Sequence, residues 1–386
     1  MKTSCASLLV LALVLAGCGT GPVHFAREGP DAADSPKLRT PAEVTRRWTR
    51  DTGAGYADSS ALLLPVAAAD RIFVADPGGL IQALDSASGK PLWRVDLEEP
   101  LAAGIGDGNS ILVVATGEGV VVALGRDNGA ELWRTAIGSE VLARPVVTEG
   151  KVLVRSGDGQ VIGLNAQTGV VGWRVRRAVP SLSVRGLSTP AIVEGVLVVG
   201  FANGRLAGID VHSGQELWNV LIARPRGSNE ITRLTDIDAD PYRVGKLLFV
   251  AAYQGRISTL SLGNQSVLWR SDISTLKPMG SRARVLLVTA DDGTIIGIDQ
   301  SSGATLWTQT ALRGRGVTGP LGLEGAERAV VGDYQGFVYL LDTVAGKVTS
   351  RARAPGGAVL AVLASSGDTF LTLSENGTLA SWIPAD

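Results

Sequence analysis

A fifteen-residue pattern that recurs along the chain constrains the fold more than any other feature. It first reads IQALDSASGKPLWRV at residues 81–95, where an alternating apolar run leads through an Asp-to-Gly turn into Leu-Trp. Nine positions separate the last residue of the first run from the Trp, as from Leu84 to Trp93. Five further copies keep the Trp, at residues 121–135, 161–175, 206–220, 257–271 and 295–309. A seventh copy keeps the spacing, from Leu341 to Ser350, but has no Trp.

A second glycine turn precedes each copy, and a β-rich run precedes that turn. Asp158-Gly159 and Gln335-Gly336 are examples of such turns, and RIFVAD or VLVVGF are examples of the runs. Gly in a tight turn between two apolar runs indicates a hairpin. Each unit therefore contains four short strands over roughly 40 residues, which is the sequence signature of a propeller blade.

The two ends of the chain decide the number of blades. The C-terminal segment contains three strands around Asn376-Gly377, and the chain then stops. The missing fourth strand is present at the other end, in VTRRWTRD, whose Trp48 lies 45 residues before Trp93. We therefore predict an all-β, eight-bladed β-propeller of four-stranded antiparallel blades over residues 45–386, closed by an N-terminal strand that joins the C-terminal blade. Each Trp is expected to pack against the next blade.

Composition limits the chemistry that the chain can perform. Both cysteines lie within the first 18 residues, and the only two histidines are His24 and His212. A Ser-His-Asp triad, a Cys-His pair or a His-rich zinc site is therefore almost excluded. The pI of 6.2 and the net charge of −1 argue against nucleic acid as the main partner.

The N-terminal sequence predicts export and attachment to a membrane. Lys2 and an apolar run of secretory length predict a signal peptide over residues 1–17. The run ends in Leu-Ala-Gly-Cys at residues 15–18, which resembles the lipobox of bacterial lipoproteins and implies lipidation of Cys18. By the same resemblance to lipoproteins, Gly19 in place of Asp implies the periplasmic face of the outer membrane. Residues 18–44 are expected to form a lipidated flexible tether. The alternative is a soluble secreted protein with an incidental Cys.

The repeat resembles the tryptophan-docking repeat of quinoprotein dehydrogenases, which two families use in eight blades. One is the PQQ-dependent alcohol dehydrogenases, and the other is the BamB family, lipoprotein subunits of the barrel-assembly (Bam) machinery in the Gram-negative outer membrane. The chain has no haem-type Cys-x-x-Cys-His and no adjacent Cys pair, and it has a lipobox, so it is more similar to the BamB family. The irregular Trp spacings, 45 and 51 residues after two of 40, are also similar to that family.

Much of the extra length lies in two segments, RRAVPSLSVRGLSTP at 176–190 and ARPRGSNEITRLTDIDADP at 223–241. Each joins the last strand of one blade to the first strand of the next, so they should be neighbours on one face of the disc. An apolar anchor beside a guanidinium and carboxylates suits an interface. Alternatively, the Arg pairs with an Asp and braces the two loops. The resemblance implies contact with the POTRA domains of a BamA-like protein through Leu182, Val184, Arg185, Asp236 and Asp238.

The resemblance implies a non-enzymatic scaffold that needs no cofactor or metal and aids folding and insertion of outer-membrane β-barrel proteins. Its partners would be the BamA-like barrel protein, other Bam lipoproteins and unfolded client proteins, whose strands could pair with blade edges by β-augmentation. One alternative is a PQQ-dependent dehydrogenase, and another is a generic periplasmic peptide- or glycan-binding propeller. Loop carboxylates available for the enzyme are Asp107, Asp158, Asp291, Asp292 and Asp333.

Overall fold

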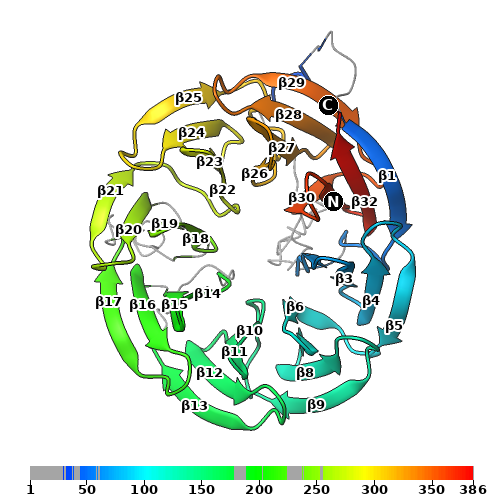
Figure 1. Cartoon of the computed structure of the whole chain (residues 1–386), viewed down its shortest axis with the longest axis vertical. Coiled ribbons are helices and arrows are strands. Elements are labelled where there is room, and N and C mark those ends of the chain that lie inside the picture. The colour runs from blue at the N-terminus through cyan, green and yellow to red at the C-terminus, as the bar shows by residue number, and fades with distance from the viewer. Residues whose placement is uncertain are drawn as a thin grey trace, which may run out of the picture.

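Eight four-stranded antiparallel sheets stand around a central axis and form a closed disc (Figure 1). The computed structural model describes residues 29, 32–36, 38, 44–57, 59, 61–177, 188–201, 203–223, 237, 239–252 and 255–385. In each sheet we label the strands A to D from the axis outward. The described residues contain no α-helix, and so none that could span a membrane. The predicted all-β, eight-bladed β-propeller is confirmed.

The first four blades follow one another in chain order. Blade 1 contains β2 (Val66–Ala67), β3 (Arg71–Ala75), β4 (Leu80–Asp85) and β5 (Pro91–Asp96). Blade 2 contains β6 (Leu101–Asp107), β7 (Ile111–Thr116), β8 (Val120–Gly125) and β9 (Glu131–Ala136). Blade 3 contains β10 (Val146–Thr148), β11 (Lys151–Arg155), β12 (Gln160–Asn165) and β13 (Val171–Arg176). Blade 4 contains β14 (Ala191–Val193), β15 (Val196–Gly200), β16 (Arg205–Asp210) and β17 (Glu216–Leu221).

The remaining blades complete the ring. Blade 5 contains β18 (Tyr242–Val244), β19 (Leu247–Ala251), β20 (Ile257–Ser261) and β21 (Val267–Ser271). Blade 6 contains β22 (Gly280–Arg282), β23 (Val285–Thr289), β24 (Ile295–Asp299) and β25 (Thr305–Gln309). Blade 7 contains β26 (Leu321–Gly322), β27 (Arg328–Gly332), β28 (Phe337–Asp342) and β29 (Val348–Arg353). Blade 8 contains β30 (Val359–Ala364), β31 (Phe370–Ser374), β32 (Thr378–Pro384) and β1 (Val44–Asp51).

Blade 8 is built from both ends of the chain, as predicted. Strand β1 pairs antiparallel with β32, in a register that runs from Val44 opposite Pro384 to Asp51 opposite Thr378. The predicted boundary at residue 45 differs from the observed start of β1 by one residue. This pairing gives the C-terminal three-stranded sheet its outer strand and joins the first and last repeats of the ring.

The Asp-to-Gly turn between strands C and D is held by the Asp side chain. In blade 1, Asp85 Oδ1 accepts hydrogen bonds from the Ser88 amide at 2.8 Å and the Ser88 hydroxyl at 2.5 Å. The Gly89 amide then donates to the Asp85 carbonyl at 2.8 Å, and Gly89 adopts a φ of +65°. A short acceptor side chain and a glycine with positive φ are what this turn requires.

The core lies between blades, and the tryptophans dominate its outer part. The indole nitrogen of Trp93, on strand D of blade 1, donates to the Arg126 carbonyl of blade 2 at 3.1 Å. Its ring covers Gly129 so closely that a Cβ on this glycine would lie 2.7 Å from the ring. The same indole donation to the next blade occurs at five further positions: Trp48 to Ser86, Trp133 to Ala166, Trp173 to Val211, Trp269 to Gln300 and Trp307 to Thr343. Trp218 packs against the apolar cluster that blade 4 shares with blade 5, so the expected packing against the next blade is confirmed.

Two departures from the repeat have structural explanations. Ser350 replaces the Trp on strand D of blade 7, and the neighbouring blade 8 has no C–D turn because its strands C and D come from opposite chain ends. A Trp at position 350 would therefore have no turn to dock on. Gln265 replaces the turn glycine in blade 5 and still adopts a positive φ of 53°.

The outer strands leave one edge of each sheet unpaired within the described sheets. A leucine precedes the docking Trp on five of these strands, and three of these leucines, Leu92, Leu132 and Leu268, are each about half exposed. An apolar side chain beside a free strand edge suits pairing with a further strand. The interpretation that client strands pair with these edges stays a prediction.

Part of the N-terminal segment that we expected to be a flexible tether contacts the propeller. Gly29 and Ala33 donate backbone hydrogen bonds to Gly314 and Arg313, in the connection between blades 6 and 7. Ser35 lies within hydrogen-bond distance of Tyr339, at 3.1 Å. The described residues from 29 to 36 therefore lie against the disc.

Removing one docking indole tests the role of the tryptophans. Trp133→Ala is expected to lower the free energy of unfolding by about 3–5 kcal/mol, because Trp133 is 9% exposed and its removal leaves a cavity between blades 2 and 3. Leu132→Ala, at the adjacent and half-exposed position, is the matched control and should cost less than about 1 kcal/mol. Denaturant unfolding measures both, and equal losses would contradict the interpretation.

Candidate binding face

The alternation of strand directions gives the disc two different faces. The A–B and C–D turns lie on one face, and the B–C turns and the D–A connections between blades lie on the other. We call the second one the D–A face. Both irregular segments leave from it, because the amide of Arg177 donates to Gly159 in the B–C turn of blade 3 at 3.0 Å. The amide of Ile222 likewise donates to Gly204 in the B–C turn of blade 4, at 2.9 Å.

The residues predicted to bind the partner lie outside the part of the chain that the structure describes. This holds for Leu182, Val184, Arg185, Asp236 and Asp238, and also for Cys18. The structure does describe the residues that flank them. These flanking residues fix where each segment leaves and rejoins the propeller.

The two segments rejoin the propeller at one shared point. The Ser188 hydroxyl, near the end of the first segment, donates to the Ile237 carbonyl in the second at 2.9 Å. The Thr189 amide donates to Asp240 Oδ1 at 2.6 Å. Arg155 of blade 3 donates to the Ser188 hydroxyl at 3.2 Å. Segments that are about 50 positions apart in the sequence are thus joined by hydrogen bonds, as expected for neighbours on one face.

Ile237 anchors the second segment in the core of blades 4 and 5. Its side chain is fully buried and packs against Val198, Leu206 and Val250. A Cβ on Gly200 would lie 2.4 Å from Ile237 Cγ2, so the glycine at the end of β15 makes room for this side chain. Burying an isoleucine contributes about 1.5–3 kcal/mol. The sequence signal was the single apolar residue between Asp236 and Asp238, but we did not identify it as an anchor.

Asp240 is a buried acid at the same point. Burial raises the pKa of Asp240, whereas the hydrogen bond from Thr189 and the positive charge of Arg144 act in the opposite direction. Ser188 and Asp240 were not identified from the sequence. Ser188 lies two residues before Pro190, and Asp240 directly precedes Pro241. Their contacts fix the described backbone that follows the predicted binding residues, so both segments end on a rigid base.

Lys277 connects two further D–A connections on this face. It lies between blades 5 and 6, and its ammonium donates to the Val317 carbonyl in the connection between blades 6 and 7. Burial lowers the pKa of Lys277 from its ordinary value of 10.5 to about 8, although the nearby charges of Asp291 and Asp292 oppose the shift. Keeping this ammonium group charged in the folded protein therefore lowers the free energy of unfolding.

The stability lost by burying the charged Lys277 depends on pH in a defined way. Below pH 8 the lysine is charged in both states and the cost is complete; it fades between pH 8 and 10.5, where the folded lysine is neutral and the unfolded one still binds a proton. Lys277→Met is therefore expected to raise the free energy of unfolding at pH 7 by about 1–2 kcal/mol, and this difference from the wild type should shrink towards pH 10. Chemical denaturation at both pH values measures it. The exposed Lys90→Met is the control, and a pH-independent difference for Lys277→Met would contradict the assignment.

The loop carboxylates considered for an enzyme do not converge. Asp107 pairs with Arg126 at 2.8 Å, and Asp158 accepts hydrogen bonds from Ser156 and Gln160 in a different blade. Asp333 forms a fully buried ion pair in blade 7. Within the described ranges, no three His, Cys, Asp or Glu side chains are grouped so that they could hold a metal ion.

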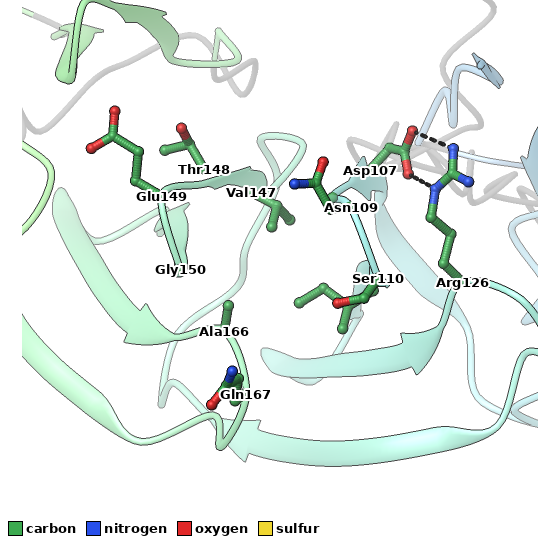
Figure 2. A pocket seen from close by; sticks show the side chains of 12 residues that line it. Asp107, Asn109, Ser110, Arg126, Val147, Thr148, Glu149, Gly150, Ala166 and Gln167 are labelled. Carbon is green, nitrogen blue, oxygen red and sulfur yellow. Dashed lines mark hydrogen bonds and ion pairs between the residues drawn. The ribbon is translucent and has the colours of Figure 1, made fainter. Parts of the chain in front are cut away.

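A polar pocket of about 680 Å³ lies on the face opposite the D–A face, between blades 2 and 3 (Figure 2). The A–B turns of both blades line it, at residues 107–111 and 147–150. Its charged groups already have partners, because Asp107 pairs with Arg126 and Glu149 accepts from His212 at 3.0 Å. The turns that line the pocket lie on the face opposite the one from which the two irregular segments leave.

Comparison with known proteins gives matches over nearly the whole chain. The family model described as outer membrane protein assembly factor BamB matches residues 77–309 and 291–382. The BamB proteins of Alkalilimnicola ehrlichii and Pseudomonas aeruginosa are 39% and 37% identical to it. The alignments cover 96% and 98% of this chain, and 94% and 98% of those relatives.

Solved structures agree with the sequence comparisons. The crystal structure of BamB from Moraxella catarrhalis superimposes with a TM-score of 0.80 at 26% identity, over 88% of this chain and 99% of that one. The quinohemoprotein alcohol dehydrogenase of Comamonas testosteroni, at 12% identity and a TM-score of 0.73, shares the propeller fold, over 89% of this chain and 77% of that one. The family-model match and the full-length relatives together show that the chain belongs to the outer membrane protein assembly factor BamB family.

Proposed function

We propose that this protein is a non-enzymatic scaffold subunit of the Bam complex that aids folding and insertion of outer-membrane β-barrel proteins. The full-length relatives, which are named as assembly factors, support the role in outer-membrane assembly. The observation that best supports the scaffold role is the shared base of the two irregular segments, where Ser188 donates a hydrogen bond to the Ile237 carbonyl. The dispersed carboxylates give no comparable support to the PQQ-dependent dehydrogenase, and no observation favours a generic peptide- or glycan-binding propeller.

The partner of the D–A face is proposed to be a BamA-type barrel protein, bound through its periplasmic POTRA domains. Leu182 and Val184 would supply the apolar contact, and Arg185 would offer a planar guanidinium to a carboxylate. Asp236 and Asp238 would bind basic or amide groups of the partner. The buried Ile237 and the bonded Ser188 support this assignment, because a base fixed before binding lowers the entropy lost on association.

Charge changes in the two segments test this assignment. Arg185→Glu, and Asp236→Ala combined with Asp238→Ala, are each expected to weaken binding to the BamA-like partner about tenfold or more, because a paired charge at an interface is lost or reversed. Co-purification from detergent-solubilised envelopes and the dissociation constant for the partner's periplasmic part measure the effect.

A charge reversal on the other face serves as the control. Lys90 is exposed in the C–D turn of blade 1, so Lys90→Glu should leave binding unchanged. All variants should unfold at the wild-type denaturant concentration, since none of the changed residues belongs to a described strand. Full partner binding by both segment variants would remove the assignment.

The protein is proposed to be anchored by lipid on the periplasmic face of the outer membrane. Residues 1–17 would be removed as a signal peptide, Cys18 would be acylated, and the residues after it would serve as a tether. The Leu-Ala-Gly-Cys sequence at residues 15–18 supports this proposal. Other Bam lipoproteins and unfolded client proteins would then meet the disc at the membrane surface.

Mass spectrometry of the mature protein tests the anchor. The expected N-terminal residue is Cys18 with added acyl mass, and Cys18→Ser should abolish both the mass and the membrane association. Cys5→Ser is the matched control, because Cys5 lies in the predicted signal peptide and its change should leave the mature protein as it is. An unmodified N-terminus at Cys18 would overturn the proposal.

A further inference from the structure

Gly29 and residues 32–36, which we call the N-terminal strap, lie along the connection between blades 6 and 7. The Gly29 amide donates to the Gly314 carbonyl at 2.7 Å, and the Ala33 amide donates to the Arg313 carbonyl at 2.9 Å. A Cβ on Gly29 would lie 3.1 Å from Gly314 Cα, so the two backbones are in close contact. The strap therefore follows the propeller backbone over several residues.

A buried arginine uses the strap to complete its hydrogen bonds. Arg315 is 2% exposed, and its Nε and Nη2 donate to Asp333 Oδ2 at 3.0 and 2.7 Å. Nη2 also donates to Gln335 at 2.7 Å, and Nη1 donates to the Ala33 carbonyl at 3.0 Å. A guanidinium donor that is buried without an acceptor is costly. The strap thus supplies an acceptor that the buried ion pair leaves open.

Ser35 attaches the strap to blade 7. Arg351, on strand D, donates to the Ser35 hydroxyl, which lies 3.1 Å from the hydroxyl of the buried Tyr339. Tyr339 in turn donates to Asp333 Oδ2 at 3.0 Å, the same oxygen that Arg315 contacts. Backbone and side-chain contacts of the strap therefore converge on one buried polar network, which distinguishes this contact from a segment lying loosely on the surface.

The strap contacts the D–A face. Gly314 and Arg313 lie beside the B–C turn of blade 6, where the Gly314 amide donates to the Asp292 carbonyl at 2.8 Å and Arg313 pairs with the Asp292 side chain at 3.2 Å. Strand β1 begins on the opposite face, because Val44 pairs with Pro384 at the far end of β32 from its B–C turn. The Gly29 end of the strap and the start of β1 therefore lie on opposite faces of the disc.

We propose that the docked strap decides which face of the disc turns towards the membrane. An undocked chain would leave the propeller at Val44, on the opposite face, 26 residues (44 − 18) from Cys18, with a maximum reach of about 90 Å. A docked chain leaves at Gly29, on the D–A face, 11 residues (29 − 18) from Cys18, with a reach of about 40 Å. The D–A face, from which both irregular segments leave, then faces the bilayer. This inference rests on the proposed acylation of Cys18.

Releasing the strap tests docking directly. Gly29→Val combined with Ala33→Pro would place a side chain against Gly314 and remove the amide that donates to Arg313. In the wild type, the amides of Gly29 and Ala33 should exchange with solvent at least about tenfold more slowly than in an unstructured peptide. The double variant should lose the protection in the rest of the strap. Asp34→Ala, at an exposed position, is the matched control and should keep it.

Energy transfer to an acceptor dye in the bilayer tests the orientation. The donor is attached either at Glu118→Cys, in a B–C turn on the D–A face, or at Ala87→Cys, in a C–D turn on the other face. The sequence has no cysteine after Cys18, so the introduced thiol is the one that reacts in the acylated protein. The dye at position 118 should transfer more efficiently than the dye at 87, and releasing the strap should reduce this difference at least twofold.

The possible outcomes separate the inference from the proposed anchor. Fast exchange at Gly29 and Ala33 in the wild type would overturn docking. A protected strap with equal transfer from both positions, or with no change in transfer on release, would overturn its role in orientation. A protein that fails to bind vesicles while the strap stays protected would show that the anchor is wrong and that docking is right.

Discussion

The contact between a tryptophan of one blade and a glycine turn of the next holds the ring together. A single four-stranded blade buries little apolar surface by itself. Most of the burial takes place between blades, where the indole packs against the neighbouring turn. The contact is specific at both partners, because Trp93 donates to a turn carbonyl and its ring occupies the space where a side chain at Gly129 would lie. Each blade thereby fixes the position and tilt of its neighbour.

The same contact explains where the ring needs a different solution. Between blades 7 and 8 no turn is available for an indole, and Ser350 stands where the other blades have Trp. The junction is instead filled by an apolar cluster from both blades, which includes Leu340 of blade 7 and Phe370 and Trp382 of blade 8. Within blade 8, the pairing of β1 with β32 converts two free chain ends into one sheet. This pairing gives blade 8 its outer strand, as in the other seven sheets.

The rigid ring makes the D–A face a platform for irregular chain. Ile237 and Ser188 hold the ends of the two long segments, and Arg315 binds the backbone of the N-terminal strap across the disc. In each case a buried side chain fixes described residues that belong to no strand. Polar groups buried at these points require a specific partner, so they select one placement for each segment.

Four features could be predicted from the sequence, because they follow from a local pattern with a fixed period: the repeat, the number of blades, the closure by the N-terminal strand and the docking role of the tryptophans. It also indicated that the two irregular segments share one face, since strand direction alternates along the chain. Tertiary structure alone decided that Ser188 meets Ile237 and that Ala33 completes the hydrogen bonds of Arg315. These contacts join residues far apart in the sequence through single side chains, and no periodic pattern in the sequence predicts them.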